Sequence, residues 1–119
     1  MRVGYAIVFV SDMRRSVAFY RDVLGLPLRF ESSHWSEFAT GEATLALHLA
    51  EAEGPPSSRE AAGSCRPGFG VTDLDAFHQQ MAAAGVPCVE EPREVFGSRL
   101  AQYRDPDGLV FSVGERRGV

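Results

Sequence analysis

Apolar and polar positions along the chain follow two periods, first that of a strand and then that of a helix. Residues 3–10 (VGYAIVFV) are almost all apolar, which is typical of a strand buried on both faces. Four apolar residues at the spacing of one helical face come next: Met13, Val17, Tyr20 and Leu24. Gly25 and Pro27 are the residue types that end a helix, so the pattern predicts a helix that begins after Asp12 and stops at Gly25.

Three shorter segments with alternating apolar and polar residues come after this helix. They cover residues 28–32, 35–40 and 43–49. In the third segment, alternation places Leu45 and Leu47 on one face and His48 on the other. The first half of the chain therefore predicts the element order β-α-β-β-β.

The same order recurs after residues 51–64, which hold prolines, serines and glycines without an apolar period and indicate an exposed linker. Residues 71–74 (VTDL) repeat residues 10–13 (VSDM) at an offset of 61, and residues 85–87 repeat residues 25–27 at an offset of 60. The second helical stripe is Leu74, Phe77, Met81 and Ala84, and the strands expected around it are residues 66–71, 86–90, 98–103 and 109–113. Such a repeat indicates a duplication.

We therefore predict one α+β domain over residues 1–119, built from two repeated β-α-β-β-β modules. Module 1 is residues 1–50, the linker is residues 51–64, and module 2 is residues 65–119. With one helix on the outside of each module, the strands are expected to form a cupped mixed sheet. Residues that point away from the helices would then meet on its concave side, where we expect a ligand cavity.

Composition and charge narrow the classes of function. The net charge is −4 and there is no basic run, which argues against a nucleic-acid partner. No apolar stretch approaches 18 residues and residues 1–12 lack a signal-peptide cleavage site, so we expect a cytoplasmic protein without a membrane partner. Cys65 and Cys88 lack CxxC spacing, and two reduced, buried or half-buried thiols are expected.

Three segments carry a family resemblance that covers essentially the whole chain. Residues 10–28 (VSDMRRSVAFYRDVLGLPL), 71–87 (VTDLDAFHQQMAAAGVP) and 99–115 (RLAQYRDPDGLVFSVGE) resemble the vicinal oxygen chelate superfamily. It contains glyoxalase I, fosfomycin resistance proteins, extradiol dioxygenases and bleomycin resistance proteins. The resemblance implies the glyoxalase/bleomycin resistance fold, on which several chemistries occur.

The resemblance also implies where a metal would bind. Metal-dependent members place their ligands at four positions, which in this chain are Tyr5, His48, Arg66 and Ser112. Only His48 is a good ligand, whereas an enzyme metal site needs about three N/O protein ligands. We therefore expect no metal cofactor, with a divalent metal held at an unusual site as the alternative.

Six residues are expected to bind a ligand, all but Trp35 placed by the same resemblance: Tyr5, Trp35, His48, Arg66, Phe96 and Ser112. Arg66 offers a fork of donors for a carboxylate or phosphate. Trp35 lies in a polar stretch, SSHWSE, and Phe96 lies where bleomycin resistance proteins carry an aromatic that stacks on the drug. A core position for Tyr5 and a surface ion pair for Arg66 are the structural alternatives.

The remaining polar residues are weaker candidates for a functional role. Glu90, Glu91 and Glu94 form an acidic patch, read either as a solvated loop or as an attraction for a cationic ligand. His34 has no partner in sequence, and His78 is expected on the exposed side of the second helix. No nucleophile triad, phosphate loop or HExxH motif is present, so the catalytic residues are unknown.

Three functions follow from these observations. The preferred one is a metal-free, homodimeric binding protein that sequesters a small aromatic or heterocyclic molecule, with antibiotic resistance as one role. The second is a metal-dependent lyase, isomerase or dioxygenase of the same superfamily. The third is an interaction module that docks another protein through a sheet edge or through Pro55-Pro56 of the linker.

Overall fold

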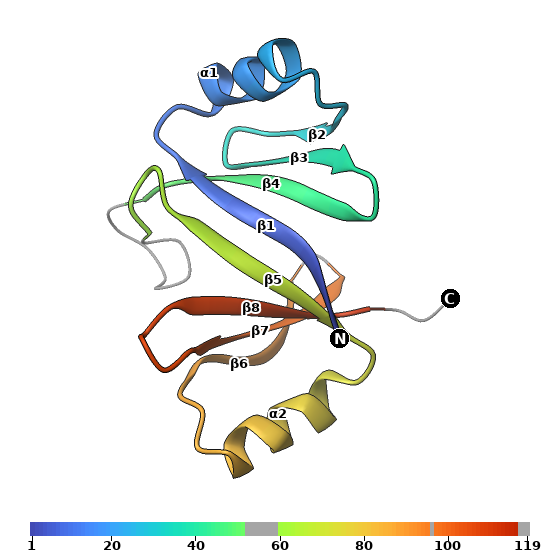
Figure 1. Ribbon diagram of the computed structural model, residues 1–119, viewed down its shortest axis with the longest axis vertical. Coiled ribbons are helices and arrows are strands. Elements are labelled where there is room, and N and C mark those ends of the chain that lie inside the picture. Colours follow the sequence, from blue (N-terminus) through green and yellow to red (C-terminus); the bar gives the residue numbers. More distant parts are fainter. Residues whose placement is uncertain (52–59, 96, 117–119) are drawn as a thin grey trace. The chain divides into compact units, whose positions relative to one another are not determined.

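The computed structural model describes residues 1–51, 60–95 and 97–116, which fall into two compact units (Figure 1). The first unit is residues 4–65, and the second is residues 66–116 together with residues 1–3. Each unit contains four neighbouring strands with a helix beside them (Figure 1). The predicted linker lies largely outside the described residues, and the boundaries of the two modules stay a prediction.

The first unit has the predicted element order. Its elements are β1 (Arg2–Val10), α1 (Met13–Ala18), η1 (Phe19–Val23), β2 (Leu28–Glu31), β3 (Trp35–Thr40) and β4 (Ala43–Leu49). The strands are ordered β2-β3-β4-β1. The chain returns from α1 through an antiparallel β2-β3-β4 meander, and β4 then pairs in parallel with β1.

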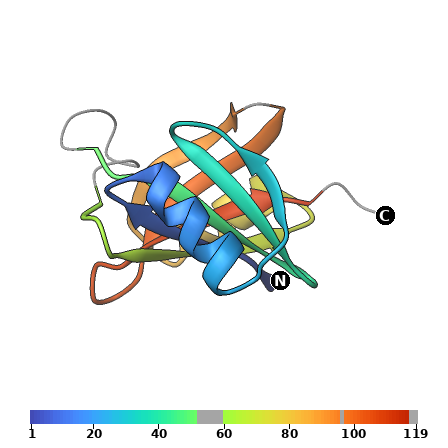
Figure 2. The same cartoon turned by 90° about the horizontal axis from the view of Figure 1, so that it is seen from above.

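Helix α1 covers one face of this sheet, as Figure 2 shows from above. The buried residues between them are Val10, Met13, Val17, Phe38 and Leu47. Asp12 caps the helix, because its carboxylate accepts the backbone N–H of Arg15 at 3.1 Å. The apolar residues that alternate along the strands therefore pack against the apolar stripe of the helix, as predicted.

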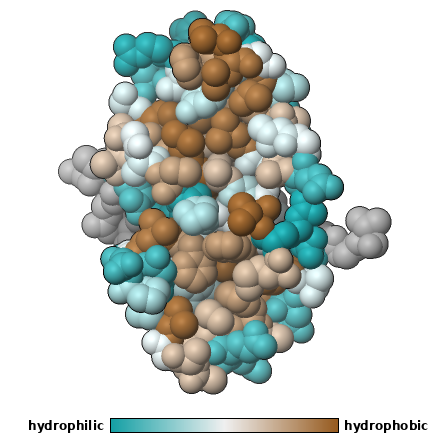
Figure 3. Space-filling model, viewed as in Figure 1, coloured by the Kyte–Doolittle hydropathy of each residue, from teal (hydrophilic) through white to brown (hydrophobic). Residues whose placement is uncertain are grey.

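The end of the first helix differs from the prediction. Residues 19–23 form a π-helical turn, in which the N–H of Leu24 reaches the carbonyl of Phe19. The extra residue in the turn rotates the following side chains away from the predicted face. Leu24 is consequently 55% exposed, and Leu26 packs on the core in its place. Figure 3 shows apolar side chains over this end of the molecule, where Phe19 and Val23 are also exposed.

The second unit repeats the topology of the first. Its elements are β5 (Cys65–Val71), α2 (Leu74–Ala83), β6 (Cys88–Val95), β7 (Ser98–Arg104) and β8 (Val110–Glu115). The strands are ordered β5-β8-β7-β6, with β5 parallel to β8 and the other pairs antiparallel. The predicted duplication is thus a duplication of strand order and of strand direction.

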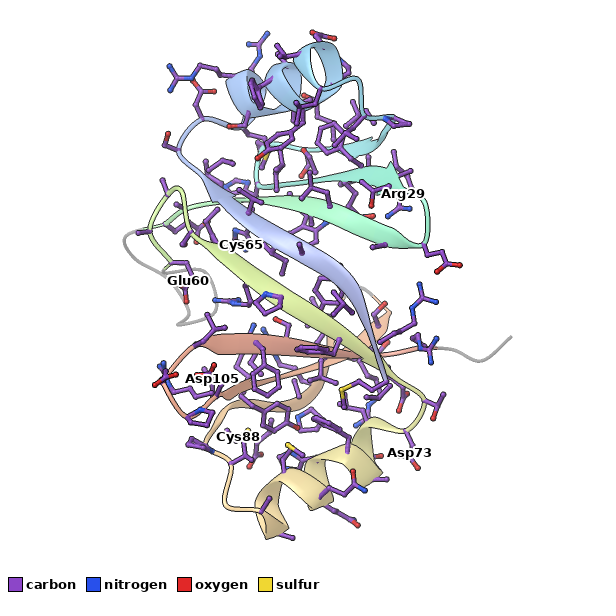
Figure 4. The ribbon with its side chains drawn as sticks, in the orientation of Figure 1. Arg29, Glu60, Cys65, Asp73, Cys88 and Asp105 are labelled. Carbon is purple, nitrogen blue, oxygen red and sulfur yellow. The ribbon has the colours of Figure 1, made fainter. Side chains whose placement is uncertain are left out.

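The start of helix α2 is held from two sides. Asp73, labelled in Figure 4, accepts the N–H of Ala76 at 3.0 Å, and Glu115 at the end of β8 accepts the N–H of Leu74 at 2.9 Å. Leu74 is fully buried, whereas Ala84, predicted as part of the buried stripe, is exposed after the last helical turn. The first turn of α2 is therefore the part anchored to the sheet.

Strand β6 runs further than predicted, from Cys88 to Val95. It carries Glu90, Glu91 and Glu94, so the predicted acidic loop is a strand. Its pairing with β7 shifts register twice, and Pro92, which cannot donate to a ladder, lies inside the second irregular stretch.

The α+β class and the twofold β-α-β-β-β order are confirmed. The described part of the chain holds eight strands and two α-helices. None of the described helices is long and apolar enough to span a membrane.

Candidate functional site

Three aromatic rings lie in a row across the first unit, on the sheet face opposite α1. The row is defined by strand register: Phe9 of β1 pairs with His48 of β4, and His48 pairs with Trp35 of β3. The centroids of Phe9 and His48 are 5.2 Å apart, and those of His48 and Trp35 are 5.7 Å apart in an edge-to-face arrangement. We call these three residues the aromatic row. Two of its members, Trp35 and His48, are residues predicted from sequence to bind a ligand.

The indole of Trp35 is held by polar side chains of the same face. Its Nε1–H donates to Glu37 Oε2 at 2.8 Å. Arg29, labelled on β2 in Figure 4, donates to Glu37 Oε1 at 3.1 Å and to the hydroxyl of Thr44 at 2.5 Å. Residues of three strands therefore fix the plane of the ring before any ligand arrives.

Phe9 and Trp35 of the aromatic row also belong to a small apolar cluster on the same face. Ile7, Phe9 and Ala46 are buried, and Tyr5 and Trp35 pack against them. Tyr5, Trp35 and His48 are themselves only half-buried. Of the predicted residues of this unit, these three are the ones whose side chains retain surface for contact with a small molecule.

The corresponding face of the second unit is polar. Arg66 and Ser112 are each 3% exposed, and Gln102, the cross-strand neighbour of Ser112, is 9% exposed. Phe69 and Val71 pack toward α2, so alternation along β5 places Arg66 on the opposite face. Gln102 Oε1 has no hydrogen-bond partner among the described residues. The alternative of a surface ion pair for Arg66 does not hold, because its side chain is buried.

The two parallel strand pairs show which positions of the repeat are equivalent. In the second unit, Gly68 pairs with Ser112, three residues before Val71. In the first unit, Ile7 pairs with Ala46, three residues before Val10. Because residues 10 and 71 are equivalent in the repeat, the counterpart of Ser112 is Ala46 and not His48, which lies two residues further along β4.

This register bears on the metal positions implied by the resemblance. Tyr5 and Arg66 are equivalent at the offset of 61, and Ala46 and Ser112 form the other equivalent pair. Neither an alanine nor an arginine can ligate a divalent cation, so this donor set does not fit a metal. Among the described residues, no three His, Cys, Asp or Glu side chains gather closely enough to hold one.

The other sequence predictions meet mixed outcomes. Phe96 lies outside the described residues. His78 is not on an exposed helix face, since its Nδ1 lies 2.9 Å from the hydroxyl of buried Tyr103. Cys65 and Cys88 are free thiols as predicted, but both are exposed rather than buried.

Phe9, Gln102 and the polar group that holds Trp35 were not predicted from the sequence. Phe9 reads as a core residue of an apolar strand, and only register shows that it borders His48. Gln102 had a detectable signal, because it is the one polar residue in LAQY, a strand segment whose other members are apolar. Glu37 had no such signal in the sequence, since a charged residue in an alternating strand is usually solvated.

The model of the Glyoxalase/Bleomycin resistance protein/Dioxygenase superfamily matches residues 2–113. The chain belongs to this superfamily. The matched residues extend over both units, and the resemblance read from the sequence is confirmed.

Several curated proteins are related to the chain over most of its length. An uncharacterized protein of Bacillus subtilis is 32% identical over 89% of this chain and 91% of its own. A virulence protein of Salmonella typhimurium is 28% identical over 96% of this chain and 83% of its own. A lactoylglutathione lyase of Haemophilus influenzae is 25% identical over 100% of this chain and 96% of its own.

Solved structures share the fold at lower identity. A hypothetical protein of Bacillus halodurans superposes with a TM-score of 0.84 at 17% identity, covering 99% of this chain and 96% of that one. A methylmalonyl-CoA epimerase of Mycobacterium tuberculosis superposes with a TM-score of 0.77 at 22% identity, covering 98% and 88%. At these identities the likeness shows the fold alone.

Proposed function

We propose that this member of the superfamily binds and sequesters a small planar aromatic or heterocyclic molecule without a metal. The observation that carries the proposal is the aromatic row, whose half-buried Trp35 and His48 offer ring surface beside Tyr5. Planar ligands gain from offset or edge-to-face contact with such rings beyond the area they bury, by about 0.5–1.5 kcal/mol per ring pair. Antibiotic resistance is one role that such binding would serve.

The polar group behind Trp35 supports binding rather than turnover. Glu37 is engaged by Arg29 and by the indole, so its carboxylate is occupied in positioning the ring. Proton-transfer chemistry would need an acid and a base within reach of one substrate atom. Besides Glu37, His48 is the titratable residue whose ring contacts Trp35 among the described residues. A fixed aromatic surface with one polar edge is suited to holding a ligand.

A titration of Trp35 emission tests this proposal directly, because Trp35 is the only tryptophan of the chain. We expect a saturable change with at least one member of a panel of planar aromatic antibiotics and heterocycles. Calorimetry on Trp35→Leu should then show affinity lowered about tenfold or more, as for an anchor residue. Phe19→Leu is the control, since Phe19 is an exposed aromatic of the π-helical turn, outside the row. A flat titration across the panel would count against the proposal.

A metal-dependent lyase, isomerase or dioxygenase is the alternative. It is favoured by the lactoylglutathione lyase among the relatives and by His48, a competent ligand near the implied positions. The metal content of protein purified without chelator or added metal separates the two. A stoichiometric divalent metal would support the alternative, and a content far below one equivalent would support metal-free binding. We also propose that the protein is a cytoplasmic homodimer. Native mass spectrometry tests whether two chains associate.

A further inference from the structure

The imidazole of His48 has a fixed orientation and a fixed tautomer. Its Nδ1 lies 2.8 Å from the carbonyl oxygen of Leu49. A carbonyl oxygen can only accept, so Nδ1 carries the hydrogen and Nε2 of the neutral ring carries the lone pair. Nε2 makes no hydrogen bond to any other residue in the described part of the chain.

The ring neighbours of His48 do not compete for Nε2. Phe9 stands on one side and Trp35 on the other, both as direct cross-strand partners. The indole nitrogen of Trp35 is already bound to Glu37, so it does not offer a hydrogen to Nε2. The aromatic row thus presents a single hydrogen-bond acceptor, Nε2 of His48, between two apolar rings.

We propose that His48 selects aromatic ligands that carry an O–H or N–H donor at the edge of the ring. This inference rests on the proposed function and names the ligand class of the same surface. The ligand ring contacts Trp35 while its donor reaches Nε2. Against the neutral ring, an aromatic that presents a carbonyl or carboxylate oxygen at this point faces a lone pair and is disfavoured. His48 is therefore a binding and specificity residue, at a position distinct from Ala46, the repeat counterpart of Ser112.

The energy of one hydrogen bond sets the size of the effect. A typical net gain corresponds to a factor of about three to ten in affinity. Three probes with the same ring separate this gain from ring contact: 2-naphthol, 2-methoxynaphthalene and naphthalene. Only the first has a donor, and calorimetry measures all three without interference from their fluorescence.

For wild-type protein we expect 2-naphthol to bind about three- to tenfold more tightly than either analogue. In His48→Phe, which keeps a ring beside Phe9 and Trp35 but removes Nε2, the three probes should bind equally. His34→Gln is the control, because His34 is exposed and contacts Ser33 and Glu51 instead of the aromatic row. That variant should keep the wild-type preference.

The outcomes separate the inference from the function on which it rests. If none of the probes binds the wild type, the proposed binding of simple aromatics fails, and the inference fails with it. If all three bind the wild type equally, binding stands and the inference is overturned. Nitrogen NMR of ¹⁵N-histidine protein gives a second reading that does not depend on a variant. The Nε2 signal of His48 should move with 2-naphthol and stay in place with 2-methoxynaphthalene.

Discussion

Trp35 donates its indole N–H to Glu37, two residues along the same strand, with 2.8 Å between Nε1 and Oε2. Both side chains point to the face opposite α1, since residues i and i+2 of a strand share a face. Arg29 engages the other carboxylate oxygen. The ring that would receive a ligand is thus fixed in the free protein, which lowers the entropy that binding must overcome.

Replacing Glu37 should weaken ligand binding through Trp35. In Glu37→Leu the indole loses its acceptor and its fixed plane, and we expect affinity for an aromatic ligand to fall about three- to tenfold. Glu37→Gln keeps an acceptor oxygen and should stay within about twofold of wild type. Calorimetry gives the affinities, and time-resolved anisotropy of Trp35 should show a more mobile ring only in Glu37→Leu. Equal affinity in both variants would contradict a positioning role.

The phenol of Tyr103 predicts a loss of stability at alkaline pH. Tyr103 is fully buried between the sheet and α2, and desolvation raises its pKa to about 12. Because the folded state holds the proton more tightly than the unfolded state, the stabilisation is complete below about pH 10 and is lost as the pH rises toward 12. Two pKa units correspond to roughly 2–3 kcal/mol.

Urea unfolding between pH 9 and pH 12 measures this loss. Tyr103→Phe should be less sensitive to pH in that window, and its absorbance titration should lack one late-ionising tyrosine. Tyr20→Phe, in the first unit, is the control and should follow the wild type. An unchanged alkaline slope in Tyr103→Phe would refute the assignment.

The Asp75–Arg99 pair predicts an effect at acid pH. Arg99 donates two hydrogen bonds to the carboxylate, at 2.9 and 3.1 Å, and these hold the pKa of Asp75 below its usual range. A lowered folded pKa stabilises the fold above the ordinary carboxyl range, and the contribution disappears as the pH falls through the lowered value. Asp75→Asn should therefore be less stable than wild type at neutral pH and equal to it in strong acid. Thermal unfolding against pH checks this, with Asp107→Asn in the β7–β8 turn as the control.

Cys88 is exposed but should react slowly with thiol reagents. Desolvation raises the pKa of its thiol, and the charges of Glu91 and Glu90 raise it further. The thiolate is the reactive species, so removing a negative neighbour should speed the reaction at pH 8 by about twofold. In a Cys65→Ser background, Glu91→Gln should show this acceleration toward a disulfide reagent. Glu94→Gln should not, because Glu94 is not among the charges that act on Cys88.

Local pattern predicts most of this fold. The strands at residues 35–40 and 43–49 have the predicted bounds, because period-two alternation reports which side chains face α1. The end of the first helix could not be predicted in this way. A π-helical turn changes the period within one turn, so apolar spacing wrongly selected Leu24 in place of Leu26.

The candidate site could be predicted only in part from the sequence. Trp35 stood out because a large aromatic in a polar stretch is unusual. Its relation to His48 and Phe9 depends on the pairing of three strands, and register is not written in any one strand. For the same reason, the resemblance alone placed the implied metal position of β4 at His48. Strand register places the counterpart of Ser112 two residues earlier, at Ala46.

On the function proposed above, the chain binds a planar aromatic molecule on the aromatic row without a metal. Calorimetry tests this binding on protein that is treated with EDTA, freed of it and then titrated with the tightest ligand of the panel. We expect saturable binding of unchanged affinity before and after treatment, and affinity lowered about tenfold or more in Trp35→Leu. Binding that disappears with EDTA and returns with a divalent metal would contradict it.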